Sequence, residues 1–150
     1  MKKALLVAIA AFSTYAFACP NLTGNYQCQD EQETWGIQVT QSVRGGVTTY
    51  SVTDDDGVTT SVIADGVSRP MPADPDFREG MMAATCMGNQ LGIESTGKIY
   101  MEDQYVGFVD LQLVMSIGNG GNLIQDADGT LTLSDGEVWD LDSSMTCTRL

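Results

Sequence analysis

The sequence predicts an all-β domain, an antiparallel meander of roughly eight to ten strands that closes into a disulfide-stapled barrel. Three observations predict it. Apolar and polar residues alternate with a period of two along several segments. Turn sequences containing Gly with Asp or Asn separate these segments. No segment after residue 18 keeps a helical period. A long meander tends to close because closure removes the exposed strand edges.

Residues 1–18 have the pattern of a secretory signal peptide. Lys2 and Lys3 precede an apolar run at residues 4–12, and Ala16-Phe17-Ala18 matches an A-x-A cleavage site. The apolar run is too short for a membrane-spanning helix, which needs about 20 residues. We therefore expect a single mature domain, residues 19–150, that is periplasmic or secreted by Gram-negative type export. Lipidation of Cys19 is the alternative, but Ala16 stands where a lipobox usually has Leu.

The composition excludes several classes of function. The 150-residue chain has 7 basic and 20 acidic residues, a net charge of −13, and no His. Cleavage would remove two lysines and no acid, so the net charge would move from −13 to −15. Nucleic-acid binding needs a cationic face, and we expect no such partner. Without His, catalysis through Ser-His-Asp or Cys-His and His-containing zinc sites are excluded.

The carboxylates do not form a recognisable site. Asp54-Asp55-Asp56-Gly57 lacks the Gly and Glu spacing of an EF-hand and is more simply a turn. Asp140 and Asp142 point outward if Trp139 and Leu141 point inward. Among 20 acids no pair stands out as a general acid and base. We expect no metal, no cofactor and no enzymatic activity.

Four cysteines follow the predicted cleavage site, at Cys19, Cys28, Cys86 and Cys147. In an exported chain they predict two disulfides with three possible connectivities. No C-x-x-C motif suggests a redox pair or a zinc site. Cys19–Cys28 with Cys86–Cys147 is the favoured pairing, and Cys28–Cys147 is a close alternative.

The clearest strands are predicted at residues 35–43, 48–53 and 105–117, the last long enough to need a bulge or a sharp bend at Gly107. The predicted turns share Gly beside a polar residue, and they lie at residues 44–46, 54–57, 88–89, 96–98, 118–121, 128–129 and 135–136. Residues 64–82 contain three of the four prolines and predict a long loop, with at most a short edge strand near Val67. Such a loop either carries function or is a structural crossover.

The two ends of the predicted domain carry a family resemblance. Gly24-x-Tyr26 resembles the G-x-W opening of lipocalins and other calycins, a group that includes small exported β-barrels. Cys147-x-Arg149 resembles their closing strand, whose arginine packs over that aromatic ring. The resemblance implies a lipocalin-like barrel that binds a small apolar ligand, with Tyr26 at its closed end.

The inward apolar faces then supply the candidate ligand-binding residues Trp35, Ile37, Tyr50, Val109, Leu111, Leu113 and Met115. Arg69 and Arg78 are candidates to pair with the acid head of an otherwise apolar ligand. The alternative is a structural or interaction module whose interior is filled by side chains. An outer-membrane barrel is disfavoured because the C-terminal residue is not aromatic.

Overall fold

The computed structural model describes residues 19–150, which form one antiparallel sheet of ten strands. The strands are β1 (Gly24–Gln29), β2 (Thr34–Arg44), β3 (Val47–Asp54), β4 (Thr59–Ile63), β5 (Arg69–Pro70), β6 (Phe77–Met87), β7 (Gln90–Met101), β8 (Gln104–Ile117), β9 (Leu123–Leu133) and β10 (Val138–Arg149), with a short 3-10 turn η1 (Asn119–Gly121). Their order in the sheet is β4-β3-β2-β1-β10-β9-β8-β7-β6-β5. The predicted meander is confirmed, and the predicted signal peptide lies outside the described residues.

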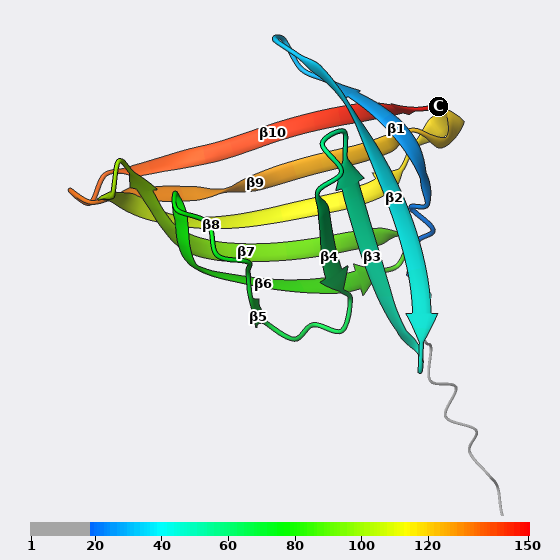
Figure 1. Cartoon of the computed structure of the whole chain (residues 1–150), viewed down its shortest axis with the longest axis horizontal. Coiled ribbons are helices and arrows are strands. Elements are labelled where there is room, and N and C mark those ends of the chain that lie inside the picture. Colours follow the sequence, from blue (N-terminus) through cyan, green and yellow to red (C-terminus); the bar gives the residue numbers. More distant parts are fainter. Residues whose placement is uncertain (1–18) are drawn as a thin grey trace, which may run out of the picture.

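The sheet curls into a half-barrel. In Figure 1, β6 to β10 run side by side as one long curved layer, and β1 to β4 cross that layer steeply at one end. Strands β4 and β5 are the two ends of the sheet and do not pair with each other, although β4 lies against β6. The barrel is therefore less closed than the sequence predicts. The reason is chemical, because β5 has only two residues and the segment around it contains three prolines, which lack ladder donors.

Alternate residues of the crossing layers form the core. The largest fully buried side chains are Tyr26, Tyr50, Leu22, Leu91 and Leu123. Tyr26 lies opposite Arg149 in the pairing of β1 with β10, and its hydroxyl donates to the carbonyl oxygen of Leu22 at 2.9 Å. Arg149 in turn donates to the carbonyl oxygen of Thr23. The two ends of the described domain thus meet around a buried tyrosine.

The bend predicted at Gly107 is confirmed, because the register of β7 against β8 shifts beside it, between Ile99 and Tyr100. A Cβ atom at Gly107 would lie 2.4 Å from the carbonyl oxygen of Thr132, so the strands approach too closely for a side chain.

Two predicted turns are wrong, since Gly97 lies within β7 and Gly129 within β9. Both glycines make room for a neighbour instead of turning the chain: the ring of Phe77 covers Gly97, and the backbone of Asp110 approaches Gly129. The real turn between β7 and β8 uses Glu102 and Asp103, both at positive φ.

The disulfides join Cys19 to Cys86 and Cys28 to Cys147, and no cysteine is free within residues 19–150. The favoured pairing of Cys19 with Cys28 and of Cys86 with Cys147 is therefore wrong. Strand pairing explains the difference. Gln27 lies opposite Thr148, so the next residues along β1 and β10 bring Cys28 to Cys147. That pair is the alternative left open by the sequence.

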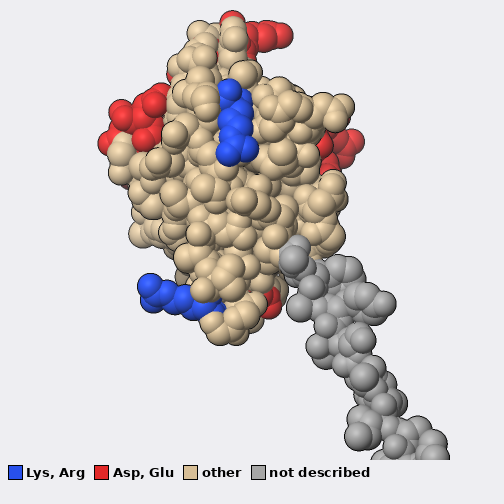
Figure 2. Space-filling model, turned by 90° about the vertical axis from the view of Figure 1, so that its right-hand side faces the viewer, with Lys and Arg blue, Asp and Glu red and all other residues tan. Residues whose placement is uncertain are grey.

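Several acidic residues lie on the outer face of the long layer. Asp140 and Asp142 are exposed, as expected, while Leu141 between them is half-buried. Asp128 on β9 lies opposite Asp142. The end of the molecule shown in Figure 2 is mostly uncharged, with acidic side chains at its margins. Among residues 19–150, no helix is long and apolar enough to span a membrane.

Candidate functional site: an apolar cavity

A cavity of about 360 Å³ lies between the long layer and the crossing strands. Its wall is mostly aliphatic and thioether, and it consists of Leu22, Ile37, Tyr50, Val52, Thr60, Val62, Met71, Met82, Leu91, Ile93, Ser95, Leu111, Leu113, Met115, Gln125 and Ala127. Residues from seven of the ten strands of the described sheet meet there, together with two residues outside the strands, Leu22 and Met71.

The strand period places these side chains. Odd-numbered residues of β7, β8 and β9 point into the half-barrel, which brings Ile93, Leu113 and Ala127 onto one cross-strand row. On the opposite side, β3 contributes Tyr50 and Val52. The resulting cavity has one wall from each layer.

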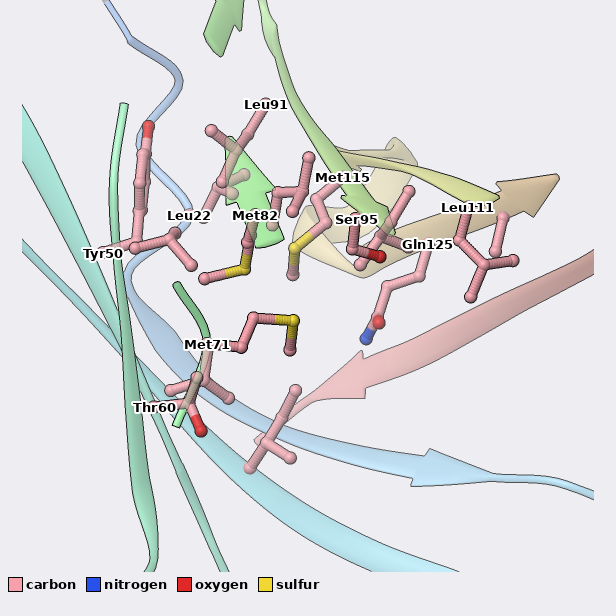
Figure 3. A pocket seen from close by; sticks show the side chains of 16 residues that line it. Leu22, Tyr50, Thr60, Met71, Met82, Leu91, Ser95, Leu111, Met115 and Gln125 are labelled. Atoms are coloured by element: carbon pink, nitrogen blue, oxygen red, sulfur yellow. The ribbon is translucent and has the colours of Figure 1, made fainter. Parts of the chain in front are cut away.

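Three methionines shape the middle of the cavity. Figure 3 shows Met71, Met82 and Met115 pointing toward one another from the segment after β5, from β6 and from β8. Thioether side chains are flexible and polarizable, so they adapt to the shape of an apolar guest.

Few polar groups face the cavity. Thr60, Ser95 and Gln125 line it, and Figure 3 shows the amide of Gln125 pointing inward. The Nε2 atom of Gln125 lies 3.5 Å from Sγ of Cys147, while its carbonyl oxygen makes no hydrogen bond within residues 19–150. Within that described range, no charged side chain lines the cavity. The site therefore suits an uncharged molecule with one or two polar groups.

Tyr50 also lines the cavity, but its hydroxyl is already hydrogen-bonded to the backbone. Its hydroxyl donates to the carbonyl oxygen of Pro20 at 2.6 Å, and burial raises its pKa from 10.0 to about 12. The phenol thus stays neutral and presents its ring to the cavity.

The structure places five of the predicted apolar residues on the cavity wall: Ile37, Tyr50, Leu111, Leu113 and Met115. Trp35 is half-buried and packs against the core without reaching the cavity. Val109 is buried farther along β8, also outside the lining. The ligand-binding role of all seven apolar candidates remains a prediction.

The two predicted arginines do not line the cavity. Arg69 forms a two-point ion pair with Asp65, at 2.8 and 2.6 Å, and also donates to the carbonyl oxygen of Val67. The hydrogen bonds from Arg69 lower the pKa of Asp65 to about 2. Arg78 pairs with Asp103 and lies over the ring of Tyr100, 4.2 Å from its centroid. Each guanidinium has a carboxylate partner outside the cavity. The role of Arg69 and Arg78 in binding a ligand's acid head remains a prediction.

Sequence reasoning missed much of the lining. Leu91 and Ile93 alternate with polar neighbours and were detectable from the period of two. Gln125 was not, because it is a polar residue on the otherwise apolar inward face of β9. Met71 follows the two-residue β5 inside a proline-rich segment that has no period at all.

The acidic run at the turn after β3 is occupied by backbone hydrogen bonds. Asp54 accepts from the backbone N–H of Val58 at 2.8 Å, and Asp55 accepts from that of Gly36. No group of three or more potential metal ligands occurs in the described part of the chain.

Comparison with known proteins supports the fold. No family model matches the chain, and no curated protein matches it. Among solved structures, a mutant of the fluorescent protein UnaG is similar, with a TM-score of 0.50 and 12% sequence identity over 85% of this chain and 95% of the other. The fold is calycin-like. Wild-type UnaG gives a TM-score of 0.49 at 12% identity, over 85% of this chain and 96% of the other. At this identity the likeness shows the fold alone, and the lipocalin motif seen at Gly24 and Tyr26 remains a prediction.

Proposed function

We propose that this protein binds a small, uncharged, mainly apolar molecule inside the half-barrel. The observation that carries the proposal is the 360 Å³ cavity with its aliphatic and methionine lining. Ligand pockets occupy roughly 300–1,000 Å³, whereas a core that serves only stability leaves few voids larger than a water molecule. The cavity falls at the small end of the ligand range.

The lining favours a neutral guest over an acidic one. Burying a carboxylate without a partner is expensive, and the nearest candidate partners, Arg69 and Arg78, are paired elsewhere. The amide of Gln125 and the hydroxyl of Ser95 supply uncharged hydrogen-bonding groups. The sequence left open an apolar ligand with or without an acid group. We propose the ligand without one.

We propose binding without catalysis. Ser95 is the only hydroxyl on the long layer's side of the cavity, and within residues 19–150 no base lines the wall to activate it. The two disulfides support an oxidising compartment, in agreement with the leader predicted at residues 1–18. We propose that the mature protein works in the periplasm or outside the cell.

The test uses the neutral fluorescent probe N-phenyl-1-naphthylamine and a cavity-filling variant. Ala127 lines the cavity, so Ala127→Trp should occupy the space of the probe and weaken binding at least about tenfold, or roughly 1.4 kcal/mol. Ala83 is the matched control, because it lies next to the cavity residue Met82 but lines an outer hollow with Glu94 and Gln112.

The control variant Ala83→Trp should bind the probe as the unmodified protein does. Circular dichroism and the thermal midpoint establish that both variants are folded. Equal binding by Ala127→Trp, or no binding by the unmodified protein, contradicts the proposed function.

A second candidate function, docking of a protein partner, is favoured by one observation. Phe108 and Val138 both lie opposite Thr132, so they share one face of the sheet, and they are 40% and 56% exposed. Exposed apolar side chains that cluster in this way are common in interfaces. If the probe does not bind and the cavity is filled, this interaction module becomes the better interpretation.

A further inference from the structure

Strands β4 and β5, the two ends of the sheet, do not pair with each other, and the gap between them lies next to the cavity. We call this gap the seam. A surface hollow of about 430 Å³ runs along this seam between β4 and the β5–β6 edge, and it is lined by Thr59, Thr60, Ser61, Val62, Ile63, Val67, Arg69, Pro70, Met71, Pro72, Met82 and Ala84. Thr60, Val62, Met71 and Met82 also line the cavity. These four side chains therefore lie between the cavity and the surface hollow.

We infer that the ligand enters and leaves through this seam and that the side chain of Met71 is its gate. The inference rests on the proposed function, since a passage matters only if the cavity holds a ligand. The other strands that line the cavity are joined to their neighbours by antiparallel ladders. The β1–β10 ladder is short, with only two opposed pairs, but no residue of β1 or β10 lines the cavity. Between β4 and β5, moving side chains apart breaks no ladder hydrogen bond, because none is formed there.

Among the four separating residues, Met71 is held least firmly. The backbone of Met82 is paired on both sides, with Arg69 and with Ser95. Val62 and Thr60 lie on β4, where they pair with Tyr50 and Val52. Met71 follows β5, and its backbone N–H makes one hydrogen bond, to the carbonyl oxygen of Gly80 at 2.8 Å.

The surroundings of Met71 leave its side chain room to swing. It also borders a third hollow of about 500 Å³, toward Phe77 and Gly80. A flexible thioether can thus move from the cavity into either outer hollow without a change of backbone. The segment before Met71 stays in place, because the N–H of Gly66 donates to Ala84 and the Asp65–Arg69 ion pair closes the loop before β5.

Stopped-flow mixing with N-phenyl-1-naphthylamine separates a gate from an ordinary wall residue. Met71→Ala should raise the association rate constant by about threefold or more. Thr60→Trp, which adds bulk at the seam, should lower the association rate constant by a similar factor. Met115→Ala is the matched control, because Met115 lines the cavity but not the seam hollow. It removes the same thioether and should change the dissociation rate alone.

The outcomes are distinct. Association that speeds up in Met71→Ala and slows in Thr60→Trp, while Met115→Ala keeps its association rate, supports the gate. Association rates that stay unchanged in both seam variants, with the probe still bound, overturn the gate and leave the proposed function intact. Absence of binding by the unmodified protein overturns both. Should one seam variant fail to fold, the other decides alone.

Discussion

Cys28 on β1 and Cys147 on β10 are covalently joined where the first and last described strands pair, one position beyond the opposed residues Gln27 and Thr148. The bond spans 119 residues of sequence. It therefore fixes the one strand pair that connects the N-terminal half of the meander to its C-terminal half.

Removing this disulfide should cost much of the domain's stability. Closing a loop of 119 residues restricts the unfolded chain by an amount worth about 5 kcal/mol. The double variant Cys28→Ser, Cys147→Ser should lose a free energy of unfolding close to that value in urea titrations. The pair Cys19→Ser, Cys86→Ser, which opens a separation of 67 residues, is the comparison and should lose slightly less. A loss below about 1 kcal/mol for the first variant would refute this role.

Tyr26 combines a buried ring with a satisfied hydroxyl. Tyr26→Ala should lower the free energy of unfolding by about 3–5 kcal/mol, the range for a buried aromatic ring. Tyr26→Phe should lower it by about 1–2 kcal/mol, because only the hydrogen bond to Leu22 is lost. Urea unfolding of both variants separates ring from hydroxyl. A change within about 0.5 kcal/mol for Tyr26→Ala would mean that the ring is not part of the core.

Tyr50 should make the fold sensitive to alkali. Its pKa is raised from 10.0 to about 12 by burial, so the folded state favours the neutral phenol. That contribution to stability is complete below pH 10 and is lost as the pH rises from 10 toward 12. The unmodified protein should therefore lose more stability across this window than Tyr50→Phe does. Identical losses in the two proteins would contradict the assignment.

The positions of Arg69 and Arg78 predict that neither side chain affects a neutral ligand. The double variant Arg69→Gln, Arg78→Gln should bind N-phenyl-1-naphthylamine with an affinity within about twofold of the unmodified protein. The physical reason is that both guanidinium groups are paired with carboxylates outside the cavity. Fluorescence titration measures the affinity. An affinity about tenfold weaker in the double variant would mean that the arginines take part in binding.

The sequence predicts most of the fold because a period of two and positive-φ glycines are local properties. The strand over residues 105–117 and the turns at Gly45 and Gly136 follow from neighbouring residues alone. The errors occur where contacts between segments far apart in the sequence determine the structure. Gly97 and Gly129 are strand residues because Phe77 and Asp110 approach them from other strands. The disulfide pairing likewise depends on β1 meeting β10, which no local pattern shows.

The candidate site was less predictable for the same reason. Five of the seven apolar candidates line the cavity, since a strand's inward face can be read from its alternation. Which part of each face borders the cavity depends on how the two layers pack against each other, and Trp35 and Val109 lie outside the lining. The partners of Arg69 and Arg78 depend on how the segments around them fold back. Asp65 and Asp103 are 4 and 25 residues away in sequence.

The most direct test of the binding cavity is a crystal structure of residues 19–150 grown with N-phenyl-1-naphthylamine. The account predicts electron density for one probe molecule between Leu113 on the long layer and Tyr50 on the crossing layer, bordered by Met71. A cavity closed by its own side chains, or a probe bound only on the outer face, would contradict it.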